Sequence, residues 1–194
     1  MNKISIHLLM SLAMFSWAIA WTNAKIVNEY LSYYNLIFLR FLLGFVSLLP
    51  FVLLLKKPFP KVSEYRYILM PSLLFLIYNV AFFKGTDYGL AGKGAILVTT
   101  LNPLFTVLLI SIINKKISTK EIIGVLLGII GGYIIMDLYN IGLKSIFDPG
   151  NIYFIICAIS WGIMTVLINY AQKIINPYSF ICICYFLTMI LTIP

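Results

Sequence analysis

The chain has 194 residues, of which 62% are hydrophobic and only 10% are charged. Its mean hydropathy of +1.01 excludes an ordinary soluble domain, in which about a quarter of the residues would be charged. The net charge of +8 comes from short basic clusters between apolar runs, which is typical of membrane orientation signals and argues against a nucleic-acid-binding surface. The sequence therefore predicts an all-α integral membrane protein.

The first apolar run covers residues 6–24 and contains Trp17 and Trp21, one helical turn apart. A basic start followed by an apolar run also fits a signal peptide, but the tryptophans and the similar runs that follow favour a retained span. The two indoles either pack in the core or at the membrane interface, or they form an aromatic wall against a ligand.

The second span is expected at residues 33–55 and contains Arg40. A helical rise of 1.5 Å per residue places this arginine roughly 10 Å inside the start of the span. A guanidinium at that depth is costly and marks a candidate functional site. The alternatives are that its side chain reaches back to the nearer membrane surface or makes a purely structural hydrogen bond.

The third span, residues 67–86, contains Asn79. An amide in hydrocarbon needs a partner, so Asn79 should face other helices, either to hold them together or to contact a substrate.

The fourth span, residues 95–113, lies within a stretch from Gly89 to Lys116 and carries polar residues in its middle. Thr99 and Asn102 need hydrogen-bond partners, and Pro103 interrupts the backbone hydrogen-bond ladder. We therefore expect this helix to face a protein interior or a cavity, and Pro103 to permit a bend that gates access.

The fifth span, residues 119–136, begins with a capping box formed by Ser118 and Glu121. Glycines at every fourth position then form a ridge that allows a neighbouring backbone to approach closely. These packing glycines are Gly124, Gly128 and Gly132.

Residues 138–150 are expected to be a loop, because Asp148-Pro149-Gly150 is a strong turn signal. A sixth span follows at residues 152–171 and a seventh at residues 178–194. Nine basic residues then fall on the side of the N-terminus and four on the other, with Arg40 left out. The excess of basic residues predicts a cytoplasmic N-terminus. The expected location is the cytoplasmic membrane.

A shift of the sequence by 144 positions places Ser16-Trp17 on Ser160-Trp161, Tyr34 on Tyr178 and Pro50 on Pro194. Spans six and seven therefore look like a second copy of spans one and two. Because five spans precede it, the second copy would enter from the opposite side of the membrane, as in the inverted repeats of many secondary transporters. The expected division is 1–137 for the first repeat, 138–150 for the connecting loop and 151–194 for the start of the second repeat.

Several short motifs, in this order and spacing, resemble the EamA-like branch of the drug/metabolite transporter superfamily over essentially the whole chain. They are Ser16-Trp17 with Asn23 and Lys25, Leu39-Arg40-Phe41, Tyr88-Gly89-Leu90-Ala91, Asn102-Pro103-Leu104, and the glycine ridge of the fifth span. The resemblance implies ten helices in two inverted five-helix repeats and export of amino acids or other small metabolites through a central cavity. Relative to that pattern, the chain is expected to be truncated after the seventh helix.

The sequence offers little material for an enzyme. All six acidic residues are expected in loops or at helix ends, and no set of metal ligands or catalytic residues converges within the spans. The three cysteines are expected to be small buried hydrophobic residues. We expect no cofactor, no metal and no nucleic-acid partner, and the oligomeric state stays open.

The resulting hypothesis is a transporter whose first four helices line a cavity near the bilayer midplane. Its substrate-binding residues would be Trp17, Trp21, Arg40, Asn79, Thr99 and Asn102. Arg40 would bind an anionic group, the amides and Thr99 would supply hydrogen bonds, and the tryptophans would form an apolar wall. A membrane subunit or remnant without transport activity is the main alternative, and a membrane-embedded enzyme is a weaker one.

Overall fold

The computed structural model describes residues 3–193 and consists of helices joined by short connections. The long helices of this part of the chain are α1 (Lys3–Asn28), α2 (Tyr33–Leu54), α3 (Arg66–Tyr88), α4 (Ala91–Asn114), α5 (Thr119–Ile135), α7 (Pro149–Ala171) and α8 (Pro177–Leu191). The shorter elements are the 3₁₀ helix η1 (Val62–Glu64), the helix α6 (Leu138–Ile141) and the 3₁₀ helix η2 (Leu143–Phe147).

The prediction of an all-α membrane protein is confirmed. Five helices, α1 to α4 and α7, are long and apolar enough to cross a membrane. The other two expected spans form helices at their expected positions, but α5 has 17 residues and α8 has 15. At 1.5 Å per residue, their lengths of roughly 26 and 22 Å fall short of a ~30 Å hydrocarbon core.

Helix boundaries follow local capping chemistry. The Ser118 hydroxyl accepts a hydrogen bond from the Glu121 amide at 3.2 Å, and the Glu121 carboxylate accepts one from the Ser118 amide at 2.6 Å, which completes the expected capping box of α5. Segment 138–150 was expected to be a loop, but it contains α6 and η2, and α7 already begins at Pro149. A proline at the first helical position costs no hydrogen bond, which explains why the turn signal there is also a helix start.

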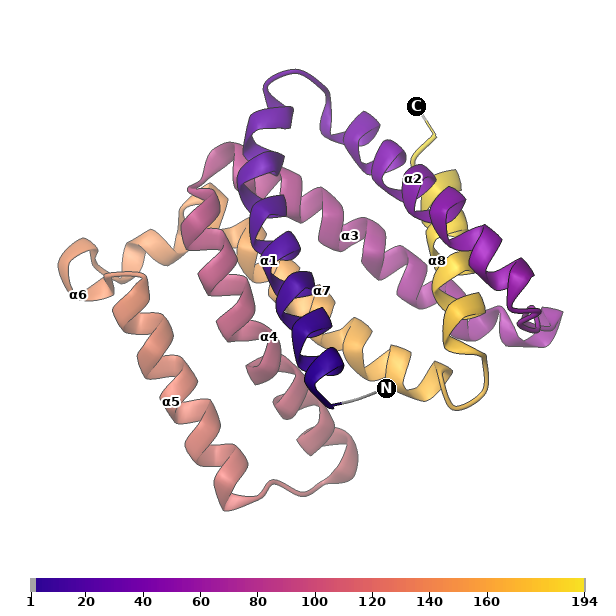
Figure 1. The fold of residues 1–194 in the computed structure, drawn as a ribbon. Coiled ribbons are helices and arrows are strands. Elements are labelled where there is room, and N and C mark those ends of the chain that lie inside the picture. Colours follow the sequence, from indigo (N-terminus) through magenta and orange to yellow (C-terminus); the bar gives the residue numbers. More distant parts are fainter. Residues whose placement is uncertain (1–2, 194) are drawn as a thin grey trace.

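Helix α7 is the centre of the bundle and packs along α3 and α4, while α2 and α8 pair with each other on one side (Figure 1). The fully buried phenyl ring of Phe154 in α7 contacts the glycines at the end of α3 and the start of α4. A Cβ atom added to Gly85 would lie 2.5 Å from this ring, and one added to Gly94 would also overlap it. These glycines therefore let α7 approach the α3–α4 turn.

Helix α5 lies at the other side of the bundle, against α4 (Figure 1). Of its three ridge glycines, only Gly128 lies close to another helix, because a Cβ added there would be 2.8 Å from Leu104. Within the described residues, nothing lies within 4 Å of the Cβ positions of Gly124 and Gly132. The structure therefore places one glycine of the expected ridge in a tight contact and leaves the other two facing open space.

The end of α1, the turn between α3 and α4 and the start of α7 meet at one edge of the bundle, as expected for helices that cross a membrane in alternating directions. The Lys25 ammonium at the end of α1 donates hydrogen bonds to the carbonyls of Thr86 and Gly89, at 3.3 and 2.9 Å. The Lys25 ammonium therefore satisfies carbonyls left unpaired at the end of α3, which is favourable for a cation at a helix C-terminus. The start of α7 meets the same region, because Tyr153 stacks on Tyr88 with ring centroids 5.9 Å apart.

Candidate functional site

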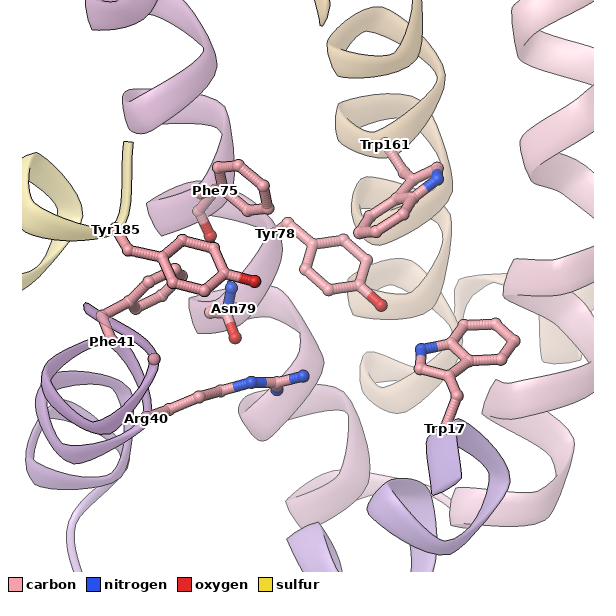
Figure 2. Close-up of a pocket in the computed structure, with 9 residues that line it drawn as sticks. Trp17, Arg40, Phe41, Phe75, Tyr78, Asn79, Trp161 and Tyr185 are labelled. Atoms are coloured by element: carbon pink, nitrogen blue, oxygen red, sulfur yellow. Dashed lines mark hydrogen bonds between the residues drawn. The ribbon is translucent and has the colours of Figure 1, made fainter. Parts of the chain in front are cut away.

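A cavity of about 380 Å³ lies between α1, α2, α3, α7 and α8 (Figure 2). Its lining residues are Trp17, Arg40, Phe41, Gly44, Phe75, Tyr78, Asn79, Trp161 and Tyr185. The start of α2, the end of α3 and the start of α7 lie at the same membrane edge. Counted from these helix ends at 1.5 Å per residue, Arg40 lies roughly 10 Å deep, Asn79 roughly 14 Å and Trp161 roughly 18 Å. The cavity is therefore near the middle of a ~30 Å hydrocarbon core.

Arg40 is the only charged residue of the lining. Its side chain extends from α2 into the space between Asn79, Tyr78 and Trp17, as Figure 2 shows. The guanidinium carbon lies 5.4 Å from the ring centroid of Phe82, a distance that allows a cation–π interaction. All six acidic residues of the chain are at helix ends or in connecting segments, so no carboxylate of a helix interior neutralises this charge.

Asn79 projects from α3 and is 2% exposed. Its amide nitrogen donates to the Phe75 carbonyl at 2.8 Å, one turn earlier in the same helix. Its amide oxygen is buried and has no hydrogen-bond partner among the described residues. A buried acceptor without a partner carries a desolvation cost of about 1–3 kcal/mol, so it is suited to receive a hydrogen bond from a ligand.

Aromatic rings form most of the remaining wall. Trp161 of α7 packs on Tyr78 of α3 with ring centroids 4.9 Å apart, and Tyr185 of α8 packs edge-on against Phe41 of α2 at 5.2 Å. Tyr185 fits against α2 because position 44 is glycine: an added Cβ would lie 2.6 Å from its ring. The wall can therefore contact a planar or apolar part of a ligand.

Trp21, expected to be a lining residue, lies next to the cavity and not on its surface. It is 2% exposed, packs edge-on against Phe82 at 4.7 Å between ring centroids, and lies tilted against Phe154 at 5.8 Å. Trp21 also contacts the lining residue Trp17, at 6.1 Å between ring centroids. It therefore supports the tryptophan and the phenylalanine that border Arg40.

The three expected polar or gating residues of α4 are not among the lining residues. The Thr99 hydroxyl is exposed and donates to carbonyls of its own helix, at 2.5 Å to Ala95 and 2.9 Å to Ile96. Asn102 faces α7, and with its amide nitrogen turned toward α7 it donates to the Ala158 carbonyl at 3.3 Å. Pro103 is exposed within an unbroken α4, which runs from Ala91 to Asn114.

Six lining residues were not predicted from the sequence: Phe41, Gly44, Phe75, Tyr78, Trp161 and Tyr185. One of them had a usable signal, because the shift of the sequence by 144 positions places Trp17 on Trp161. The others are aromatic or small residues in apolar runs rich in such residues, so composition and spacing did not distinguish them.

No cluster of three or more potential metal ligands occurs within residues 3–193. The three cysteines are fully buried and unpaired, as expected for small hydrophobic residues. The arrangement can therefore bind a small molecule through one cation, one amide oxygen and aromatic faces.

Comparison with known proteins identifies the family of the chain. The chain is 26% identical over 154 residues to the uncharacterized transporter YoaV of Bacillus subtilis (strain 168), an alignment that covers 77% of this chain and 52% of that protein. The chain thus spans about half the length of the curated relative it matches. No solved structure matches it significantly. The model of the EamA-like transporter family matches residues 4–137, well over half of the chain, so the protein belongs to the EamA-like transporter family.

Proposed function

We propose that the protein is a secondary transporter that exports amino acids or other small metabolites across the cytoplasmic membrane by alternating access. The proposed substrate site is the midplane cavity. Trp17, Arg40 and Asn79, together with the aromatic residues from α2, α3, α7 and α8, would contact the substrate. Trp21 would act by supporting Trp17, and no role in substrate binding is proposed for Thr99 or Asn102.

The observation that carries the proposal is a pair of polar groups that line one aromatic cavity at mid-membrane depth: the Arg40 side chain is exposed to the cavity, and the Asn79 side chain is buried in its wall. The Arg40 guanidinium has no carboxylate at its depth, and the Asn79 amide oxygen has no hydrogen-bond partner among the described residues. At this depth in a membrane such groups are costly unless water or a ligand pairs with them. A molecule with a carboxylate, a hydrogen-bond donor and an apolar or aromatic part would satisfy all the surfaces of the cavity.

The organisation of the chain supports alternating access. We propose that residues 1–137 are the first repeat, that 138–150 connect the repeats, and that 151–194 begin an inverted second repeat. The meeting of α7 with the α3–α4 turn fits this arrangement, because α7 then crosses in the direction opposite to α1. The excess of basic residues at the other membrane edge supports a cytoplasmic N-terminus.

Binding to the purified chain in lipid nanodiscs tests the site directly, because Trp17 and Trp161 border the cavity and report occupancy by fluorescence. A pool of amino acids and small carboxylic acids is screened, and the affinity of the best ligand is measured. Loss of a charged hydrogen bond costs about 1.5–3 kcal/mol, so Arg40→Gln should weaken binding by roughly 10- to 100-fold.

The control is Lys120→Gln, which removes an exposed cation near the start of α5, outside the cavity. Its affinity should equal that of the unchanged protein. Equal affinities for all three proteins would refute the assignment of Arg40. Counterflow of the labelled ligand in vesicles then separates a carrier from a binding subunit, because only a carrier exchanges solute across the membrane.

A further inference from the structure

A second surface feature lies outside the transport cavity, at the membrane edge where α3 begins and α7 ends. It is a groove of about 500 Å³ between these helices, lined by Arg66, Tyr67, Met70, Pro71, Leu167, Tyr170, Lys173 and Ile174. None of these residues lines the cavity that contains Arg40. The groove has no role in the proposed transport site.

Its two cations stand at the rim and its apolar residues lie deeper. Arg66 is the first residue of α3 and Lys173 follows the end of α7 by two residues, whereas Met70 and Leu167 lie one turn inside their helices. One turn of helix is about 5–6 Å, which is the step from the headgroup region into the acyl chains. From the membrane surface inward, the groove therefore changes from charged to apolar, as a phospholipid changes from its headgroup to its acyl chains.

Both cations are positioned by neighbouring tyrosines. The Arg66 guanidinium lies 4.8 Å from the ring centroid of Tyr67 and donates to its hydroxyl at 3.0 Å. The Lys173 ammonium lies 5.1 Å from the ring centroid of Tyr170. The carboxylate nearest in sequence to Arg66 is Glu64, and it accepts a hydrogen bond from the Lys61 amide at 2.8 Å. Tyrosines that hold two cations over an apolar groove form an amphipathic rim suited to the membrane interface.

We infer that this groove is a binding site for an anionic phospholipid. Arg66 and Lys173 bind the phosphate-bearing headgroup from both sides, and one acyl chain lies along Met70, Pro71 and Leu167. The lipid thereby bridges α3 of the first repeat and α7 of the second. The charge of the rim selects an anionic headgroup over a zwitterionic one.

The test uses the whole chain in detergent with added phosphatidylglycerol or phosphatidylcholine, and native mass spectrometry counts the retained lipids. Each basic residue near a membrane surface contributes about a fivefold gain in affinity for anionic lipid. The double variant Arg66→Gln/Lys173→Gln should therefore lose about 30-fold in affinity for phosphatidylglycerol. The control Lys116→Gln/Lys120→Gln removes two exposed charges expected at the same edge but outside the groove, and it should retain the lipid.

Two further measurements distinguish binding of the headgroup from binding of the acyl chain in the groove. Met70 is 55% exposed, so Met70→Trp should fold, fill the groove and release the lipid although both cations are kept. Inorganic phosphate should not raise the thermal unfolding midpoint as phosphatidylglycerol does. The inference is overturned if phosphatidylcholine is retained equally, if the control loses as much lipid as the groove variant, if Met70→Trp changes nothing, or if phosphate alone reproduces the stabilisation.

Discussion

At the scale of single residues, the cavity combines two groups that the folded chain leaves incompletely paired. Arg40 contacts the face of Phe82, and the Asn79 oxygen has no partner among the described residues. Polar groups kept in this way cost stability and are expected where function requires them. The same residues should therefore show opposite effects on stability and on binding.

Asn79→Leu tests this opposition. Leucine has nearly the same shape but no acceptor to desolvate, so the free energy of unfolding should rise by about 1 kcal/mol. Ligand affinity should fall by roughly five- to tenfold, because the hydrogen bond to the ligand is lost. Thermal unfolding and tryptophan fluorescence titration measure the two effects. A lower unfolding midpoint together with unchanged affinity would show that Asn79 is only a structural residue.

The sequence was most informative about residues whose chemistry is costly in a membrane. Arg40 and Asn79 stood out as polar residues in apolar runs, and both line the cavity. Thr99 stood out for the same reason, yet its hydroxyl is satisfied by its own helix, an outcome that a linear pattern does not distinguish from a binding role. Tyr185 joins the cavity only through the packing of α8 on α2, which no local pattern predicts.

At the scale of helices, glycine positions determine which elements approach closely. Gly85 and Gly94 surround the Phe154 ring, whereas Gly92, two residues from Gly94, has no neighbour within 4 Å of its Cβ position among the described residues. The difference between Gly92 and Gly94 is a property of packing and not of sequence context, since both lie in the first turn of α4.

Gly94→Ala should lower the free energy of unfolding by about 1–3 kcal/mol, because the new methyl group overlaps the fully buried Phe154 ring. The matched variant Gly92→Ala should be neutral or stabilising by up to ~1 kcal/mol through helix propensity. Thermal unfolding of both variants in detergent measures the difference. Equal midpoints would contradict the packing of α7 against the α3–α4 turn.

The hydropathy pattern predicted the helices well because the membrane requires long apolar runs with internally satisfied backbones. It did not predict the short α6 and η2, because the turn residues near Asp148 and Pro149 also suit helix caps. It did not predict which glycines of α5 pack closely either, because that depends on the neighbour: Gly128 meets Leu104, and Gly124 meets nothing within 4 Å in the described chain.

At the scale of the whole molecule, five helices from both ends of the chain enclose one cavity. Helices α7 and α8 contribute Trp161 and Tyr185, so the site depends on contacts between residues far apart in the sequence, such as Tyr78 with Trp161 and Phe41 with Tyr185. The surrounding bundle should accordingly behave as one folded unit in the membrane.

The reactivity of the native cysteines tests whether the bundle is one folded unit. Cys157, Cys182 and Cys184 are all 0% exposed and come from α7 and α8. A small water-soluble maleimide should leave them unlabelled in the folded protein and modify all three after denaturation. Tyr139→Cys, at a side chain 85% exposed, supplies the positive control. Labelling of the native cysteines without denaturant would mean that α7 and α8 are not stably packed against α2, α3 and α4.

The central claim is that Arg40 faces an aqueous cavity in the middle of the membrane and not the surrounding lipid. In a background with the three native cysteines replaced by alanine, Arg40→Cys and Leu39→Cys place a thiol at nearly the same depth but about 100° apart around α2. Leu39 is 40% exposed and is not a cavity residue. A water-soluble thiol reagent should modify the thiol at position 40 severalfold faster than that at position 39, and a bound ligand should protect the thiol at position 40. Equal rates at the two positions, with no protection, would contradict the central claim.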